Sequence, residues 1–174
     1  INDVRCSGEA IFVQPSVLSA AGELADRLGH IAPDGLTRTT FVNSGTEATE
    51  VALKIARAHT GRLGVLTTAN SFHGKTLGAL SATGNIKYQS GFGAPVEGFD
   101  HVDFGDSDAL DAALAAAPGH YAVFLVEPIQ GEAGVVLPDE GYLSSVRLLC
   151  SKYNVLFIAD EIQTGLARTG KMLA

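Results

Sequence analysis

The hydrophobic and polar positions along the chain alternate between helical spacing and short apolar runs, which predicts alternating helices and strands. Apolar residues at helical spacing predict helices at residues 17–29, 46–60, 75–83, 107–117 and 141–152. Short β-rich or apolar runs predict strands at residues 39–42, 64–68, 121–127 and 155–159. The glycine-rich residues 85–100 predict a long surface loop.

Signals at the ends of these helices agree with the periodicity. Gly29 and Gly61 stand where the first two helices are expected to stop, because glycine readily adopts the left-handed conformation of a helix end. Glu50 and Lys54 are spaced for an i,i+4 ion pair. The aspartate-rich start of residues 107–117 suits the positive end of a helix dipole.

Two of the expected strands, residues 121–127 and 155–159, are apolar on both faces, which is typical of buried strands in a parallel sheet. The helix predicted at residues 141–152 would make the right-handed crossover between them. We therefore expect an α/β fold with a doubly wound, mostly parallel sheet. Ligands in such folds bind at the carboxyl ends of the strands.

Composition narrows the possible partners. Among 174 residues, 12 Lys and Arg stand against 19 Asp and Glu, so the formal net charge is −7. An acidic chain without a basic run is a poor binder of nucleic acid or anionic membranes. The longest strongly apolar run is far too short to span a bilayer, and no secretory signal is visible at the start. Two distant cysteines, Cys6 and Cys150, fit a reducing compartment, which predicts a cytoplasmic protein.

The first candidate site is the turn Ser44-Gly45-Thr46, where a helix follows a predicted strand at once. The free N–H groups of a first helical turn and the helix dipole favour an anion there. Gly45 allows a phosphate to approach the backbone, and the Thr46 hydroxyl can add a hydrogen bond. The alternative interpretation is an ordinary helix cap formed by Ser44 or Thr46.

Three further clusters follow predicted strands. Phe72 and His73 could stack on a planar ligand, or could be a core aromatic beside a surface histidine. Glu127 and Glu132 lie in a loop after an apolar strand, either paired or as solvated carboxylates. Asp160 ends the most apolar strand, where it needs a hydrogen bond or a cation, such as a protonated ring nitrogen, unless it simply caps the next turn.

One triplet is a decoy. Asp103-Phe104-Gly105 spells the magnesium-binding triplet of kinases, but no glycine-rich loop, lysine strand or catalytic loop accompanies it. We interpret the adjacent Asp106 as a helix cap.

In order along the chain, four stretches resemble the class-III pyridoxal-phosphate aminotransferases of fold type I. The resemblance runs from about Leu36 to Ala174 and rests on FVNSGTEATEVALKIAR, ANSFHGKTLGALSAT, VEPIQGEAGVVLPDEGYL and LFIADEIQTGLARTGKMLA. It implies that residues 1–36 are an N-terminal helical segment of the large domain. Residues 37–174 would be the front part of the domain that binds pyridoxal 5′-phosphate.

The resemblance also implies roles for the candidate residues. Gly45 and Thr46 would hold the cofactor phosphate, with Ser44 shaping the turn. Phe72 would stack on one face of the cofactor ring, with His73 beside it, and Ile162 would pack on the other face. Asp160 would form an ion pair with the ring nitrogen, and Gln163 would donate a hydrogen bond to the phenolic oxygen. Glu132 would form a gate with an arginine outside the chain.

Two departures from the family pattern refine this interpretation. Lys75 follows the Phe-His-Gly triplet where ornithine- and acetylornithine-type members often have arginine, which favours a diamine-type site because lysine cannot clamp a carboxylate bidentately. The lysine that binds the cofactor covalently in this family falls beyond Ala174. We therefore expect the isolated chain to lack turnover.

The resemblance implies that the complete protein is a homodimer that transfers a terminal amino group from ornithine, putrescine or a similar amine to 2-oxoglutarate. Within the family, an acetylornithine or 4-aminobutyrate aminotransferase, an isomerase and a decarboxylase are alternatives. Outside it, the chain could be a truncated homologue that binds the cofactor or dimerises without chemistry. The last alternative is a doubly wound domain that binds another phosphorylated ligand.

Overall fold

The computed structural model describes residues 18–174, and the chain divides into two compact units between Phe41 and Val42. In the first unit, helix α2 (Ser19–Ile31) continues past Gly29, so the predicted stop at that glycine is wrong. The helix ends just before Pro33, because the residue that precedes a proline is restricted to extended conformations; Ala32 has ψ 157°.

The strand predicted at residues 39–42 is also wrong. These residues pair with no strand in the described part of the chain, and a lone strand has no ladder to stabilise it. The domain boundary expected at residue 36 stays a prediction about the complete protein.

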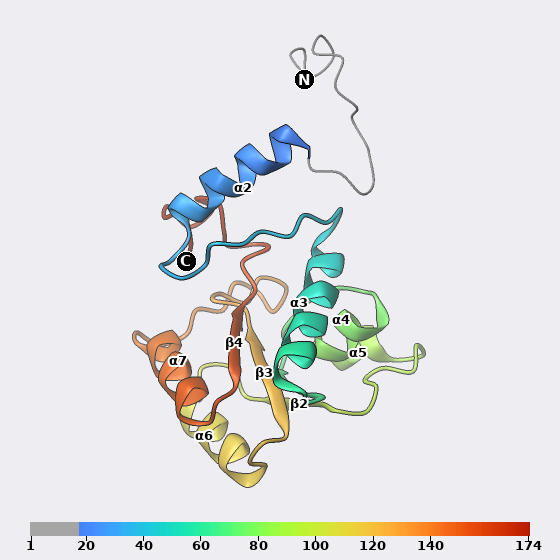
Figure 1. Ribbon diagram of the computed structural model, residues 1–174. Helices are drawn as coiled ribbons and strands as arrows, with labels where there is room; N and C mark the ends of the chain where they lie inside the picture. The colour runs from blue at the N-terminus through green and yellow to red at the C-terminus, as the bar shows by residue number, and fades with distance from the viewer. Residues whose placement is uncertain (1–17) are drawn as a thin grey trace. The chain divides into compact units, whose positions relative to one another are not determined.

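The second unit is built on a four-stranded sheet with the order β2-β1-β3-β4, and all neighbouring strands run parallel (Figure 1). This confirms the predicted parallel α/β sheet. The strands are β1 (Gly64–Thr68), β2 (Phe99–Val102), β3 (Tyr121–Val126) and β4 (Leu156–Ala159).

Helices cover both faces of this sheet (Figure 1). Alternate side chains of β3 point to opposite faces: Phe124 and Val126 pack in the apolar cluster that includes α6 and α7, whereas Val123 and Leu125 pack in the cluster that includes α3 and α4. The helices of this unit are α3 (Gly45–Thr60), α4 (Leu77–Ala82), α5 (Ile86–Gln89), α6 (Ser107–Ala116) and α7 (Tyr142–Lys152).

The helix ends predicted at Gly61 and Asp106 are confirmed, and in both cases the hydrogen-bond partner is close in sequence. Gly61 ends α3 in the left-handed conformation with φ 69°, as predicted. The Asp106 carboxylate accepts a hydrogen bond from the Ala109 N–H at 2.8 Å, so Asp106 is a helix cap. The ion pair expected between Glu50 and Lys54 is not present among the described residues, because Glu50 binds the start of α4 instead.

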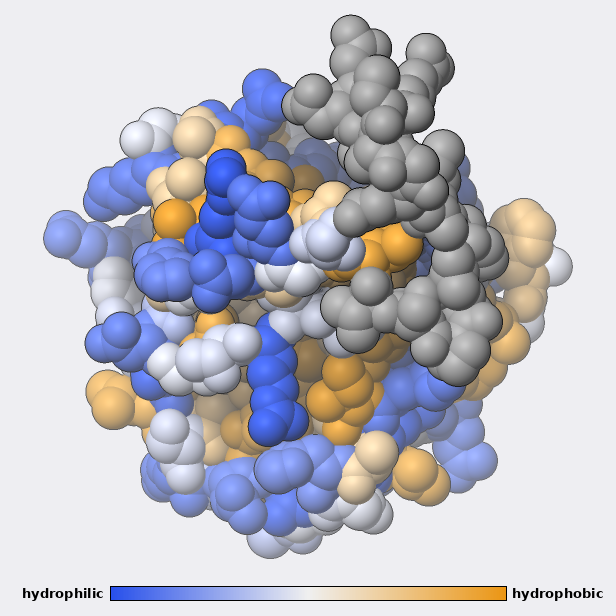
Figure 2. Space-filling model, turned by 45° about the horizontal axis from the view of Figure 1, so that its top comes forward, coloured by the Kyte–Doolittle hydropathy of each residue, from blue (hydrophilic) through white to orange (hydrophobic). Residues whose placement is uncertain are grey.

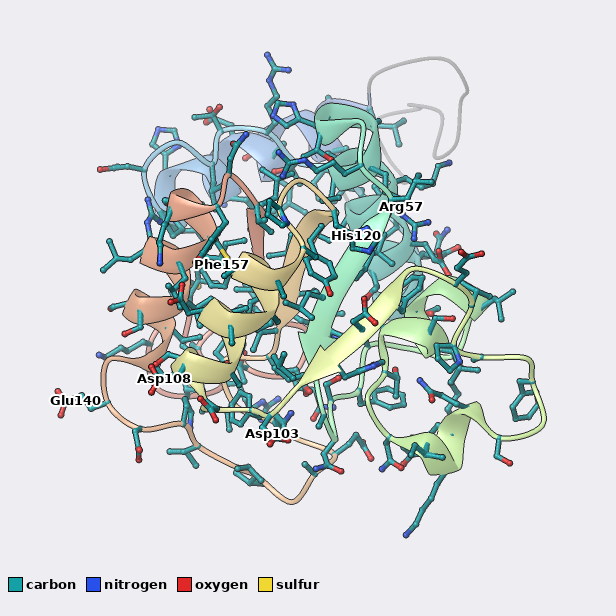
Figure 3. All side chains as sticks on the ribbon, turned by 90° about the horizontal axis from the view of Figure 1, so that it is seen from below. Arg57, Asp103, Asp108, His120, Glu140 and Phe157 are labelled. Carbon is teal, nitrogen blue, oxygen red and sulfur yellow. The ribbon has the colours of Figure 1, made fainter. Side chains whose placement is uncertain are left out.

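Two predictions about the sheet needed correction. Helix α5 lies wholly inside the loop predicted at residues 85–100, and strand β2 begins within it. The hydrophobic pattern did not predict β2 because its sequence, FDHV, is half polar. Strand β3 is fully buried, but β4 is only partly buried because it lies at the edge of the sheet. Seen from below in Figure 3, Phe157 of β4 lies beside α6 and α7.

The surface mixes hydrophilic and hydrophobic residues (Figure 2). Within residues 18–174, no helix is long and apolar enough to cross a membrane. Apolar side chains that are more than two thirds exposed include Leu63, Ile86, Phe92, Leu148 and Leu166.

The core between α6 and the sheet can be tested with a matched pair of leucines. Leu110 is fully buried, whereas Leu148 is 72% exposed. We expect Leu110→Ala to lower the free energy of unfolding by about 2–5 kcal/mol, because it leaves a cavity. Leu148→Ala should change it by less than about 0.5 kcal/mol. Urea unfolding followed by circular dichroism measures both, and equal effects would contradict this packing.

Candidate functional site

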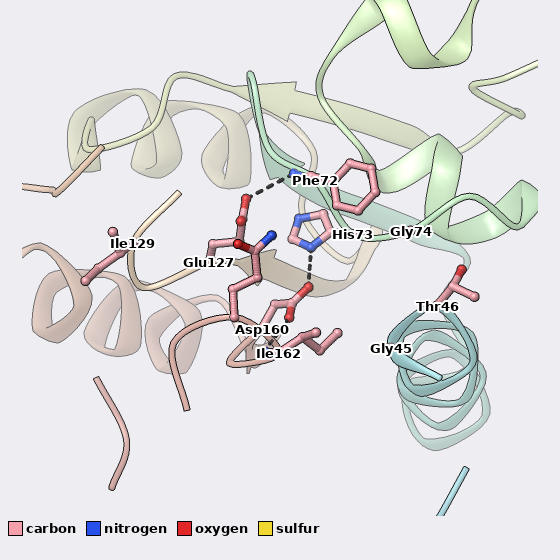
Figure 4. Close-up of a pocket in the computed structure, with 10 residues that line it drawn as sticks. Gly45, Thr46, Phe72, His73, Gly74, Glu127, Ile129, Asp160 and Ile162 are labelled. Atoms are coloured by element: carbon pink, nitrogen blue, oxygen red, sulfur yellow. Dashed lines mark hydrogen bonds and ion pairs between the residues drawn. The ribbon is translucent and has the colours of Figure 1, made fainter. Parts of the chain in front are cut away.

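A hollow opens at the carboxyl edge of the sheet, where β1, β3 and β4 end. Its walls come from the first turn of α3 and from the loops after these three strands (Figure 4). This is the edge at which the parallel topology predicts ligand binding. The lining residues are Gly45, Thr46, Phe72, His73, Gly74, Glu127, Ile129, Asp160, Ile162 and Gln163.

The first turn of α3 presents backbone donors to the hollow. Ser44 caps the helix by accepting a hydrogen bond from the Glu47 N–H at 3.3 Å. Hydrogen bonds from the Asn43 N–H and the Ser44 hydroxyl hold the pKa of the Glu47 carboxyl below its usual range. The N–H groups of Gly45 and Thr46 have no partner within residues 18–174, as expected for a first helical turn. They are therefore free to bind an anion.

The Thr46 hydroxyl, in contrast, is occupied. It accepts hydrogen bonds from the N–H groups of Lys75 and Thr76, both at 3.2 Å. The Thr76 hydroxyl donates to Glu50 at 2.6 Å, so the Thr46 hydroxyl must donate its own proton to Thr76 Oγ1 at 2.8 Å. The Thr46 hydroxyl thus ties the loop after β1 to α3, and the predicted bond from this hydroxyl to a phosphate is not available in this arrangement.

Glycine at position 45 allows close packing. A Cβ atom added to Gly45 would lie 3.1 Å from two side-chain carbons of Ile162, so Ile162 would have to shift by a few tenths of an ångström. Without a side chain at position 45, Ile162 lies directly against the first turn of α3. The two ends of the second unit, α3 and the loop after β4, are thereby brought to one side of the hollow.

A buried hydrogen-bonded pair of side chains lines the hollow. The Asp160 carboxylate and the His73 imidazole are joined by a hydrogen bond of 2.7 Å between Oδ2 and Nδ1 (Figure 4). Oδ1 of Asp160 accepts a second hydrogen bond, from the Ile162 N–H at 3.1 Å. Because a carboxylate offers only acceptors, Nδ1 of His73 carries a proton. Nε2 of His73 lies 3.1 Å from the Thr67 hydroxyl of β1.

The backbone of His73 is fixed as firmly as its ring. Its N–H donates to the Thr83 hydroxyl and its carbonyl accepts from the Thr49 hydroxyl, each at 2.9 Å. His73 is 2% exposed, so the alternative interpretation as a surface histidine is wrong. Its three threonine partners come from α3, β1 and the end of α4.

A second carboxylate, Glu127, lines the hollow beside Asp160. Its oxygens accept hydrogen bonds from the N–H groups of Phe72 at 3.0 Å and Gly131 at 3.3 Å. Burial raises the pKa of the Glu127 carboxyl; the two N–H groups and His73 oppose this shift, whereas the charge of Asp160 adds to it. The alternative interpretation of Glu127 as a solvated loop carboxylate is wrong.

Of the nine residues to which the sequence assigned a role, seven line this hollow and two lie outside its lining. Ser44 lies behind it as the cap of α3. Glu132 is exposed, and its carboxylate lies 3.5 Å from the Tyr88 hydroxyl. Its role as a gate stays a prediction. The seven that line the hollow are Gly45, Thr46, Phe72, His73, Asp160, Ile162 and Gln163.

Sequence reasoning missed the residues that hold these groups in place. Thr67 and Thr49 are buried threonines within a strand and a helix, where nothing local marks them as partners of a histidine. Glu127 was noticed because of its position after an apolar strand, but its two backbone partners come from different loops.

Comparisons with known proteins agree with this geometry. The family profile of aminotransferase class-III matches residues 10–174. The chain belongs to the class-III aminotransferase family. Members of this family use pyridoxal 5′-phosphate as their cofactor, which supports the cofactor expected from the sequence.

Solved structures show the same fold. A transaminase from the marine bacterium Virgibacillus is 30% identical with a TM-score of 0.90, and the alignment covers 99% of this chain and 42% of that one. The ornithine aminotransferase of Toxoplasma gondii is 36% identical with a TM-score of 0.87, covering 97% and 41%. An (S)-enantioselective omega-transaminase from Thermomicrobium roseum is 31% identical with a TM-score of 0.90, covering 98% and 44%. The chain thus spans less than half the length of these relatives.

The proton on His73 gives a test of the buried pair. In Asp160→Asn, the amide oxygen can keep the Ile162 N–H bond only if the amide NH₂ faces His73 Nδ1. Nδ1 must then become an acceptor, and we expect the proton to move to Nε2, where the Thr67 hydroxyl can accept it. Long-range ¹H–¹⁵N correlation spectra distinguish the two tautomers. Thr67→Val is the control, because it leaves Asp160 in place and Nδ1 protonated; an unchanged Nδ1 proton in Asp160→Asn would contradict the assignment.

Proposed function

We propose that this chain forms the cofactor-binding face of a class-III aminotransferase and that it binds pyridoxal 5′-phosphate in the hollow at the carboxyl edge of the sheet. One observation carries the proposal: the buried Asp160–His73 pair and the free N–H groups of the first turn of α3 line the same hollow. A pyridinium nitrogen and a phosphate are the two charged ends of this cofactor. An acid and a set of amide donors are the partners that those ends require.

The residues present fit the group. The N–H groups of Gly45 and Thr46 would bind the phosphate. The Thr46 hydroxyl would not, because it is hydrogen-bonded to Thr76. The remaining roles would be contact with the two ring faces by Phe72 and Ile162, an ion pair with the ring nitrogen by Asp160 and a hydrogen bond to the phenolic oxygen by Gln163.

Asp160 has the surroundings that this role needs. His73 Nδ1–H and the Ile162 N–H both donate to its carboxylate and hold it in place beside the hollow. The negative charge next to the hollow would favour a protonated ring nitrogen. When bound, the cofactor supplies an electron sink for the reacting carbon of an amine substrate, and the protonated nitrogen strengthens it.

For the complete protein, we propose amino transfer between a terminal amine and a 2-oxo acid, with ornithine or putrescine as the amine and 2-oxoglutarate as the acceptor. The ornithine aminotransferase of Toxoplasma gondii, 36% identical, supports ornithine. Lys75, at the position after Phe-His-Gly, supports a diamine over acetylornithine. A homodimer and a cytoplasmic location are part of this proposal.

Binding of pyridoxamine 5′-phosphate to the 174-residue chain tests the cofactor site directly. This amine form cannot react with surface lysines, so its fluorescence reports the non-covalent site alone. We expect saturable binding that weakens about tenfold or more in Asp160→Ala, because a shift of one unit in the pKa of the ring nitrogen corresponds to a factor of ten. Gly45→Asp should abolish binding, since it adds a negative charge beside the phosphate and places a Cβ atom against Ile162.

Glu140→Gln is the matched control for charge, because Glu140 is exposed and projects away from the rest of the structure (Figure 3). Absence of binding by the wild-type chain, or equal binding by all variants, would refute the cofactor site. Tight binding of inorganic phosphate with no response to Asp160→Ala would instead favour a module for another phosphorylated ligand. Amino transfer itself is measured on the complete protein with a panel of amines and 2-oxoglutarate.

A further inference from the structure

The buried carboxylate of Glu127 has no role in the function proposed above. Glu127 and Asp160 directly follow Val126 and Ala159, which face each other in the ladder between β3 and β4. The two carboxylates therefore leave the sheet at the same edge, and both line the hollow. Such a pair of acids side by side is costly unless each has partners of its own.

The partners of the two acids differ in kind. Asp160 accepts a hydrogen bond from a side chain, the His73 imidazole. Glu127 is 3% exposed, and within the described chain its oxygens receive only the backbone N–H groups of Phe72 and Gly131. A buried carboxylate held by two backbone donors fixes the positions of both donors, because loss of either bond leaves a buried polar group unpaired.

These two donors lie on different loops. Phe72 follows β1 and carries the ring proposed to contact one face of the cofactor, whereas Gly131 belongs to the loop after β3. The Glu127 carboxylate is thus a bridge across the base of the hollow. Figure 4 shows its bond to Phe72 next to the bond that joins His73 to Asp160.

Gly131 in turn lies next to the Gln163 side chain, another residue of the hollow. A Cβ atom added to Gly131 would meet the carboxamide of Gln163, so an alanine at this position would displace that carboxamide. Through its two bonds, Glu127 contacts the backbone of Phe72 on one side and the backbone of Gly131, beside Gln163, on the other.

The loop after β3 does not depend on Glu127 alone. The buried Gln130 side chain donates to the Thr68 hydroxyl at 3.2 Å and to the Ala69 carbonyl at 2.8 Å. The backbone of Gln130 also pairs with Val136 in an isolated antiparallel bridge. These contacts hold the loop against β1 when the Glu127 carboxylate is changed, so a variant at Glu127 is expected to fold.

We propose that Glu127 is a positioning residue that fixes the Phe72 backbone relative to Gly131, beside which Gln163 lies, and thereby sets the fit of the hollow to a flat pyridine ring. This inference rests on the proposed cofactor site. It assigns to Glu127 a geometric role that acts through two backbone N–H groups, without contact between Glu127 and the reacting atoms.

Glu127→Gln keeps the volume of the side chain but supplies one acceptor oxygen where two are needed. Its NH₂ group would face either the Phe72 or the Gly131 N–H, so one of the two bonds is lost. Glu127→Asp keeps the charge, but its side chain is one methylene shorter and cannot reach both donors. The two variants therefore separate the geometric role from a role of the charge alone.

The test measures binding of pyridoxamine 5′-phosphate together with the induced circular dichroism of the bound ring at saturation, which reports ring orientation. We expect Glu127→Gln and Glu127→Asp each to weaken binding about tenfold and to change the induced signal. Gly131→Ala, which displaces Gln163 without touching Glu127, should change the signal as well. Glu140→Gln is the control and should match the wild type.

The outcomes decide between the possibilities. Wild-type induced signals in Glu127→Gln or in Gly131→Ala would overturn the positioning role, even if thermal melting shows a loss of stability. Wild-type binding in Glu127→Asp but not in Glu127→Gln would overturn it in favour of the charge. If Glu127→Gln fails to fold, Glu127→Asp decides the matter, because a wild-type induced signal in that variant would overturn the positioning role. No binding by the wild-type chain would instead refute the proposed cofactor site, and this inference with it.

Discussion

The bond between Asp160 and His73 is the interaction on which the site depends. Asp160 ends a strand among apolar neighbours, and an ionised carboxylate in such surroundings is stable only with partners. His73 supplies one, from a loop 87 residues away in sequence, and buried threonine hydroxyls fix its ring and backbone. The sheet thus carries a charge at its carboxyl edge because three other elements hold the imidazole that faces it.

The parallel sheet explains why these groups meet. Because β1, β3 and β4 run in the same direction, the loops that follow them emerge at one edge. The first turn of α3 reaches this edge through the packing of Gly45 against Ile162 and through the hydroxyl chain from Thr46 to Glu50. The backbone N–H groups at its start are free for an anion because a first helical turn offers them no carbonyl partner.

The two acids at this edge show how environment separates residues of similar chemistry. Asp160 accepts a hydrogen bond from an imidazole, and the oxygens of Glu127 accept hydrogen bonds from two backbone N–H groups. Glu132, only a few residues after Glu127 in the same loop, is exposed and lies outside the lining. In each case the partners decide what the carboxylate can do.

Local pattern was enough for the parts of this chain whose stabilising contacts are close in sequence. The periodicity of residues 46–60 predicted α3, and the left-handed Gly61 and the capping Asp106 are decided within one helical turn. The local pattern did not predict pairing between distant segments. Residues 39–42 have the sequence of a strand but no partner in the described chain. Half-polar β2 is a strand because it pairs with β1.

The same division holds for the site. The sequence by itself determined which residues could carry charge and donors, since Asp160, His73, Gly45 and Glu127 all stand just after strands or before a helix. Only the tertiary structure decided their partners, because a hydrogen bond depends on distance and direction between groups that lie far apart along the chain. It gave Asp160 an imidazole and Glu127 two backbone N–H groups, and it joined the Thr46 hydroxyl to Thr76.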